Sequence, residues 1–451
     1  MHGQIQAAGV AGMFYPAQAD ACANMVDSFL AAARRVPVAP KAVIAPHAGF
    51  AYSGPIQASA YAPLAARRGE IARVVILAPA HRVGFSGLAL SPAEGWETPL
   101  GVLPVDWAWL GRILHLPHVA VDATPFAREH ALEVQLPFVQ RALGEVAICP
   151  VLVGGAAPDL VAAALRALWG GPETAIVISS DLSHYHDDAT ARAKDGSAAD
   201  AIETLRSEAL SGDLACGHRA IAGLLREAQT RDLRATALDL RNSGATSGQP
   251  DRVVGYGAFA FEQASNARLD DAGRQTLRDA ARRGIALRLR NNAVPHVDLD
   301  RSKTPLLAAR RASFVTLEID GRLRGCIGSL QPHLPLATDV VVNACKAATA
   351  DPRFPPMTEA DLARVALHVS ILSHARPIAC ASEAELLRAL HPDVDGLIIR
   401  DGQRQSLFLP SVWSSLPDPR NFLRQLKQKA GMAPDHWSPQ FRAWRFATEA
   451  F

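Results

Sequence analysis

The sequence has few of the features that mark a disulfide-linked, zinc-finger or strongly charged protein. Its six cysteines among 451 residues contain no C-x-x-C pair, so neither a zinc-finger spacing nor a small-domain disulfide framework is present. The 46 Lys and Arg nearly balance the 44 Asp and Glu, and no block of like charge is long enough for a nucleic-acid or membrane tail. We therefore expect reduced cysteines, no nucleic-acid partner and no membrane partner.

Long hydrophobic runs are also missing. Residues 42–66 contain no Asp, Glu, Lys or Arg, but they hold three prolines, a histidine and a glutamine, which exclude a lipid-spanning helix. The first nineteen residues lack a basic start and a continuous apolar stretch, and Pro16 interrupts them. This is not the pattern of a signal peptide, and we expect a cytoplasmic protein by default.

The length of the chain and its hydrophobic pattern predict two domains. In the first half, apolar β-branched runs alternate with helical stretches rich in alanine and leucine, which is typical of an α/β sandwich with a largely parallel or mixed sheet. The predicted strands are 42–47, 73–81, 146–155, 174–184 and 252–261, and the predicted helices lie near 18–34, 129–143, 157–169, 187–210 and 218–228.

After Phe261 this alternation stops at a polar, turn-rich segment, and we place the boundary there, with domains 1–264 and 265–451. Residues 314–330 and 396–412 each hold two alternating runs around an Asp-Gly turn, which predicts two hairpins. Helices are expected near 271–288, 335–349, 382–390 and 419–430. The second domain is therefore predicted to be α+β.

Potential metal ligands follow three of the predicted strands. His47 ends one strand, His81 ends another, and Asp181 with His184 ends a third. Ligands of open parallel sheets bind beyond the carboxyl ends of the strands, so these side chains should converge. Two imidazoles and a carboxylate suit iron(II), zinc, copper or manganese, and they match the non-haem iron arrangement. The alternative is that each histidine only binds a loop carbonyl.

Two further sets of residues are candidates for chemistry. His130 and Glu133 are three apart on a predicted helix, where they would share one face and could serve a metal or a proton relay; the alternative is an ordinary first turn with acidic residues favoured by the helix dipole. Cys326 lies between Gly325 and Gly328 in a predicted hairpin. It is either a thiol nucleophile that a substrate approaches closely or a structural cysteine at a bulge.

These residues lie in segments that resemble two known families. "APHAGFAYSGP" (45–55), "APAH" (78–81), "EHALEVQLPF" (129–138) and "SSDLSHY" (179–185) together resemble the Memo family, whose members are structurally similar to class III extradiol ring-cleaving dioxygenases. "LRGCIGSL" (323–330), "DPRFPPMT" (351–358) and "DGLIIRDGQRQSLFLPSVW" (395–413) resemble the AMMECR domain family. The chain thus looks like a fusion of a Memo domain with an AMMECR domain.

The Memo resemblance implies metal-binding roles for His47 and His81 and places an acidic and imidazole pair at Asp181 and His184. The cysteine of animal Memo proteins falls on Gly248, which leaves the third ligand open among Asp181, His184, Glu133 and a substrate. Under the resemblance, Asp181, His184, His130 and Glu133 are the candidate catalytic residues of this domain. The metal is expected to be divalent, iron(II) first, with zinc or copper as alternatives.

Memo and AMMECR proteins occur beside a radical-SAM protein in AmmeMemoRadiSam systems, which implies such a partner here. We expect a metal-dependent enzyme that acts on a small molecule. The alternative is a non-catalytic adaptor that binds a metal or a peptide. The sequence names neither the substrate nor the reaction, and it leaves the role of Cys326 and the oligomeric state open.

Overall fold

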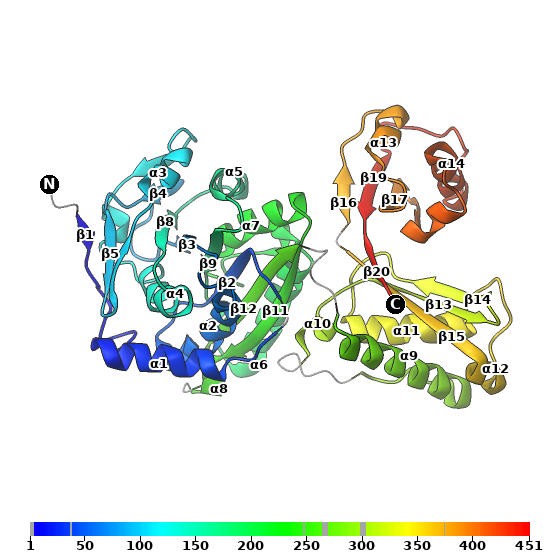
Figure 1. Ribbon diagram of the computed structural model, residues 1–451, viewed down its shortest axis with the longest axis horizontal. Coiled ribbons are helices and arrows are strands. Elements are labelled where there is room, and N and C mark those ends of the chain that lie inside the picture. Colours follow the sequence, from blue (N-terminus) through cyan, green and yellow to red (C-terminus); the bar gives the residue numbers. More distant parts are fainter. Residues whose placement is uncertain (1–3, 37, 247–248, 264–268, 298–303, 374) are drawn as a thin grey trace. The chain divides into compact units, whose positions relative to one another are not determined.

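The computed structural model describes residues 4–36, 38–246, 249–263, 269–297, 304–373 and 375–451 (Figure 1). The described chain divides into two compact units, one up to residue 263 together with 304–305, and the other from residue 269 onward. This confirms the predicted arrangement in two domains. The predicted boundary at 264 and 265 lies outside the described residues.

A mixed sheet forms the middle of the first unit. Its described strands are β2 (Ala42–Ala45), β3 (Arg73–Pro79), β4 (Leu88–Leu90), β7 (Val119–Val121), β8 (Ala147–Val153), β9 (Thr174–Ser179), β10 (His184–His186), β11 (Leu233–Asn242) and β12 (Val253–Gln263). They are ordered β10-β12-β2-β9-β3-β8-β4-β7, and β11 pairs with β12. The central strands β2, β9, β3 and β8 are parallel, whereas β12 and β4 run antiparallel to β2 and β8.

Both faces of this sheet are covered, because its central strands are apolar on both sides. The helices of the unit are α1 (Ala19–Ala32), α2 (Phe50–Ala65), α3 (Trp107–Leu110), α4 (Leu136–Leu143), α5 (Pro158–Leu168), α6 (Asp188–Glu203), α7 (His218–Thr230) and α8 (Ser243–Thr246). Residues of α5, α6 and α7 share one buried cluster with the sheet. Helix α2 contacts β2 and β12 and packs against α1 and α4.

Helix α2 and strand β11 are the longest elements of this unit that the sequence pattern did not predict. Helix α2 contains Pro55 and Pro63, and because proline usually disrupts a helix interior, the sequence did not predict a helix here. Ten of the sixteen residues of α2 are nevertheless buried. Gly54 lies where α2 crosses α1, since a Cβ atom there would approach Phe29 Cε2 to 2.4 Å. Gly54 allows α1 and α2 to pack closely. Strand β11, which pairs with β12, is the second long element that the sequence analysis did not predict.

Smaller elements complete the first unit. A second sheet joins β1 (Ile5–Gln6), β5 (Gly95–Thr98) and β6 (Gly101–Pro104). Short 3-10 helices lie at Gly111–Ile113, Thr124–Phe126, Glu133–Gln135 and Ser207–Ala209. Among the described residues, no helix has the length and apolar character that a membrane span would need.

The second unit contains two antiparallel sheets with helices. One has the order β14-β13-β15-β20 and the other the order β16-β19-β17-β18. The strands are β13 (Ser313–Ile319), β14 (Arg322–Gly328), β15 (Val365–Leu372), β16 (Arg376–Ile378), β17 (Gly396–Asp401), β18 (Arg404–Phe408), β19 (Arg442–Phe446) and β20 (Thr448–Ala450). Both predicted hairpins are present; at the first, Asp320 and Gly321 have positive φ, as a tight primed turn requires.

The helices of this part of the chain are α9 (Asp271–Asn291), α10 (Pro305–Ala308), α11 (Leu336–Thr349), α12 (Glu359–Arg364), α13 (Glu383–Ala389) and α14 (Pro419–Lys429), with a 3-10 helix at Pro410–Ser414. Helix α11 packs against both α9 and β13. Residues of α13, β17, β19 and α14 meet in a separate core around Trp413 and Phe422, whose rings stack 3.7 Å apart.

Candidate metal centre

The carboxyl ends of β2, β3 and β9 bring three of the predicted residues together. His47, His81 and Asp181 each follow the last residue of their strand by two positions. The ring centroids of His47 and His81 are 5.1 Å apart, and the backbone N–H of His47 donates to Asp181 Oδ1 at 2.8 Å. The parallel order of the strands therefore places these side chains at one edge, as the pattern indicated.

The hydrogen bonds around His47 fix which ring nitrogen carries the proton. Ser179 Oγ donates its single hydrogen to the carbonyl of Ala131 at 2.7 Å and also accepts a bond from Gln135. His47 Nδ1 lies 2.8 Å from the same oxygen, so Nδ1 must be the donor. The lone pair of Nε2 is then free, and burial lowers the pKa of His47 well below its usual value. The neutral ring is the form that binds a metal.

Glu129 orients His81 in a similar way. Its Oε2 accepts the backbone N–H of His81 at 2.5 Å, and its Oε1 lies 2.9 Å from His81 Nδ1. Burial by itself raises the pKa of Glu129, but the hydrogen bonds and charge of His81 outweigh it and lower the pKa to about 2. An ionised Glu129 accepts the proton of Nδ1, which leaves His81 Nε2 as the ligand atom. Such a carboxylate–histidine pair is common behind metal ligands.

Cys216 completes a group of three ligand atoms. One nitrogen of His47, one of His81 and the sulfur of Cys216 all lie within 4.8 Å of one another. The Cys216 sulfur is 3.4 Å from His47 Nε2, the nitrogen whose lone pair is free. A second group with such spacing joins His81, Glu129 and His130, but there the Glu129 oxygens are already taken by His81.

The local backbone holds Cys216 in this place. Its N–H donates to the carbonyl of Asp181 at 3.3 Å, and the next residue, Gly217, donates to Ser180 Oγ at 2.9 Å just before α7 begins. A Cβ atom on Gly217 would lie 2.7 Å from Ser180 Cβ, so only glycine fits. Burial and the charge of Asp181 raise the pKa of the Cys216 thiol to about 12. Without a nearby cation this thiol stays protonated.

His130 and Glu133 do not share a helix face, and the prediction that they do is wrong. Helix α4 begins only at Leu136, after a 3-10 turn, with Pro137 in its first turn. The His130 ring stacks on His81 with centroids 5.0 Å apart. Glu133 instead accepts bonds from the N–H groups of Gly9 and Val10 and from Tyr15 Oη. Glu133 therefore binds the segment that contains Gly9, Val10 and Tyr15.

Asp181 contacts two members of the three-ligand group, His47 through Oδ1 and Cys216 through its carbonyl, and the charge of His184 acts on both His47 and Asp181. Burial raises the pKa of Asp181, although the N–H of His47 and the neighbouring histidines act against this. His184 Nδ1 is 2.8 Å from the carbonyl of Leu182, and because a carbonyl can only accept, Nδ1 carries the proton. His184 Nε2 is thus left as a base, and the charges of His184 and Asp181 interact.

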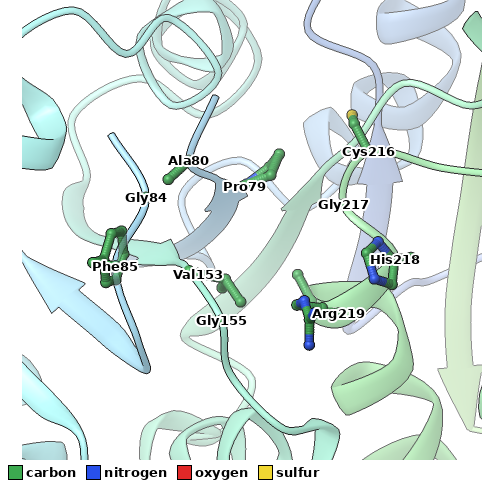
Figure 2. A pocket seen from close by; sticks show the side chains of 12 residues that line it. Pro79, Ala80, Gly84, Phe85, Val153, Gly155, Cys216, Gly217, His218 and Arg219 are labelled. Atoms are coloured by element: carbon green, nitrogen blue, oxygen red, sulfur yellow. The ribbon is translucent and has the colours of Figure 1, made fainter. Parts of the chain in front are cut away.

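A cavity of about 300 Å³ borders the group at Cys216 (Figure 2). It lies between the end of β3, at Pro79 and Ala80, and the start of α7, where His218 and Arg219 stand. This volume is at the lower end of the range for ligand pockets, which fits a small molecule.

Gly248 and Cys326 are the two predicted positions that the structure does not describe near this group. Gly248, where the resemblance placed the family cysteine, lies outside the described residues. Cys326 is on β14 in the second unit. Cys216 and Glu129 were missed because neither follows a strand. The sequence feature that could have identified Cys216 is a cysteine followed by a glycine immediately before the amphipathic helix α7.

Comparison with known proteins gives a family for each half of the chain. A family model described as Memo-like protein matches residues 6–260, and one described as AMMECR1 matches residues 278–451. A MEMO1 family protein of Aquifex aeolicus is 32% identical over 270 residues, which cover 57% of this chain and 99% of that protein. A protein of Methanothermobacter thermautotrophicus is 37% identical over 183 residues, 40% of this chain and 94% of its own. The crystal structure of an uncharacterized protein from Pyrococcus horikoshii, 30% identical, covers 41% of this chain and 92% of its own with a TM-score of 0.38.

Proposed function

This chain belongs to the Memo family, with an AMMECR1 domain fused after its Memo domain, and from this membership we propose that it is a metal-dependent enzyme acting on a small molecule. The observation that carries the proposal is the group of His47, His81 and Cys216, whose ligand atoms converge within 4.8 Å. From the wider family resemblance we also infer an extradiol-dioxygenase-like fold for the first domain and an α+β AMMECR fold for the second.

The residues of the group fit a metal ion on chemical grounds. The protonated Cys216 thiol lies 3.4 Å from His47 Nε2, and a divalent cation could replace this hydrogen bond with bonds to all three ligand atoms. Hydrogen bonds at Nδ1 orient both imidazole rings, with Ser179 for His47 and with Glu129 for His81. Such partners are usual for metal-binding histidines. His47, His81 and Cys216 would therefore hold the ion.

The proposed chemistry divides between the ion and the side chains around it. When bound, a divalent ion would act as a Lewis acid on an oxygen atom of the substrate. His184 Nε2 is the nearby base that would take a proton from a substrate hydroxyl group. Asp181 holds the backbone of His47 in place, and the cavity at Cys216 would take the body of the substrate.

The choice of Cys216 as the third ligand changes which metal is expected, because its sulfur would bind the ion as a thiolate. The sequence put iron(II) first on the assumption of a carboxylate as third ligand. Two imidazoles with one thiolate suit zinc and copper as well as iron(II). We therefore propose a divalent ion, with zinc, copper and iron(II) as equally suitable candidates.

The test is the metal content of the full chain purified without oxygen. The wild type is expected to hold about one ion per chain after loading with iron(II) or zinc, because three ligand atoms already converge. The His47→Ala, His81→Ala double variant should hold close to none. Elemental analysis measures both, and the exposed His115→Ala variant is the matched control. Equal metal content in the wild type and the double variant would contradict the proposal.

The radical-SAM partner and the adaptor alternative rest on the family resemblance alone. If this chain works with a radical-SAM protein, the two should co-purify without oxygen when the full chain is used as bait. The His47→Ala, His81→Ala variant separates partner binding from metal binding, since an adaptor that does not use the metal would still co-purify with the radical-SAM protein. Failure of the two proteins to associate would count against the partnership and leave the metal centre to its own test.

A further inference from the structure

The cavity beside Cys216 carries an arginine in its lining and no carboxylate to balance it. Arg219 lines the cavity, and none of the other described lining residues is an Asp, Glu, Lys or Arg. Arg219 Nη1 donates to the carbonyl of Ala156 at 3.2 Å, which holds the side chain in place without cancelling its charge. An anion in this cavity would therefore meet a guanidinium group that pairs with no carboxylate among the described residues.

The first turn of α7 presents unbonded N–H groups to the same cavity (Figure 2). Gly217, at the N-cap position, has no side chain that could accept them. No described residue accepts the N–H of Arg219 or of Ala220, and both residues line the cavity. The positive end of a helix of 13 residues thus borders a cavity that already contains a cation.

His218 gives a separate indication that a ligand binds here. It lines the cavity, and its Nδ1 is buried but bonds no described residue. Buried side-chain nitrogen atoms nearly always have a hydrogen-bond partner, and one without a partner calls for an explanation. His47 and His81, by contrast, are both held through Nδ1. The ring of His218 is therefore available for a bond to a ligand.

The rest of the cavity wall is mostly apolar and is held in place by the backbone. Pro79, Phe85 and Val153 contribute to it. The N–H of Gly155 donates to the carbonyl of Phe85 at 2.7 Å, and a Cβ atom on Gly154 would lie 2.3 Å from the same oxygen. These contacts join two loops into a fixed wall. A ligand of this cavity would need an apolar body of small size.

We propose that the cavity binds a small substrate by an oxyanion group, a carboxylate or a phosphate, which accepts hydrogen bonds from Arg219 and from the first turn of α7. The apolar body of the substrate then lies against Phe85 and Val153, and its reacting end faces Cys216. This inference rests on the proposed function, because it takes the metal centre as the place of reaction. It adds the class of substrate, a small anion with an apolar body.

The experiment compares two probes of similar size and different charge, para-fluorobenzoate and para-fluorobenzamide. Each is titrated into the full chain after removal of metal with a chelator, and binding is measured by fluorine NMR. The benzoate is expected to bind roughly tenfold more tightly than the benzamide, because only the benzoate gains charge-assisted hydrogen bonds. Added salt should reduce this difference. Equal affinities of the two probes would overturn the proposal.

Variants of Arg219 locate the bound anion. Arg219 is exposed, so its replacement should leave the fold intact. Arg219→Gln should weaken the benzoate roughly tenfold and leave the benzamide unchanged, whereas Arg219→Lys keeps the charge and should keep most of the affinity. Arg226→Gln is the matched control, since Arg226 lies on the same helix, pairs with Asp159 and does not line the cavity. An unchanged affinity for the benzoate in Arg219→Gln would refute the site.

Competition identifies the group that the site prefers. Acetate and inorganic phosphate are each added to the complex with para-fluorobenzoate. The one that displaces the probe at the lower concentration names the oxyanion, and failure of both to displace it would contradict the proposal.

A zinc-loaded sample distinguishes this inference from the proposed function. If the benzoate bound only in the presence of zinc, and equally well in Arg219→Gln, it would be a ligand of the ion; the anion site would be wrong while the metal centre stood. If the His47→Ala, His81→Ala variant and the wild type held equally little metal, the metal centre would fail. Binding of the benzoate that depends on Arg219 would then still establish the anion site.

Discussion

Replacing Cys216 with serine is expected to weaken metal binding by roughly a hundredfold. A four-ligand structural zinc site is stabilised by about 10–16 kcal/mol, so one ligand accounts for about 3 kcal/mol. Serine keeps the size of the side chain and its contact with the Asp181 carbonyl but removes the thiolate. The affinity is measured by competition with a chelator, using zinc and iron(II) on protein handled without oxygen. A cobalt(II) spectrum provides a second measurement, since the sulfur–cobalt absorption band should disappear.

Asp181→Asn is the contrasting variant, because the sequence pattern favoured Asp181 as the third ligand. An asparagine oxygen can still accept the N–H of His47, so the affinity should fall by less than about tenfold, the lower range for an outer residue. Cys380→Ser controls for the loss of a thiol elsewhere. If Asp181→Asn lost more affinity than Cys216→Ser, the ligand set of His47, His81 and Cys216 would be wrong.

Replacing Glu133 with alanine is expected to destabilise the first unit by about 3–5 kcal/mol. The buried carboxylate accepts three hydrogen bonds, from the N–H groups of Gly9 and Val10 at 2.9 Å each and from Tyr15 Oη at 2.6 Å. Alanine leaves these donors without a partner, at a cost of about 1–3 kcal/mol for each group that stays buried. The free energy of unfolding is measured by hydrogen exchange in urea on peptides of the first unit, so that the second unit does not contribute.

Smaller changes at the same position separate the contributions. Tyr15→Phe removes one donor and should cost about 1–2 kcal/mol. In the Glu133→Ala background the same change should cost much less, because the bond is already gone. Glu145→Ala, at an exposed glutamate, should be close to neutral. Additive losses for Tyr15 and Glu133 would show that the hydrogen bond does not contribute.

The convergence of His47, His81 and Asp181 was predictable because it depends on short-range features. Fully buried strands such as β2 and β9 have short apolar sequences rich in valine and isoleucine, which a sequence pattern can identify. Parallel strands place their carboxyl ends at one edge of the sheet. The positions at which these apolar runs end were therefore enough to predict that the three residues lie close together.

Cys216 and Glu129 could not be found in this way, because their positions depend on tertiary packing. Cys216 reaches the histidines only because the loop before α7 is bonded to Ser180 and Asp181. Glu129 reaches His81 from an irregular segment, where no periodicity indicates the direction of a side chain. The same irregularity explains the error over His130 and Glu133, since the helix expected from residue 129 begins only at Leu136.

The spacing of the three ligand residues along the chain has a consequence for how the protein is made. Cys216 and His47 are 169 positions apart, with the strands β3, β8 and β9 synthesised between them. A nascent chain that has exposed only the two histidines presents an incomplete site. Under the proposed ligand set, all three ligands are therefore available only after residue 216 has left the ribosome, and fragments ending before residue 216 should emerge from translation without the ion.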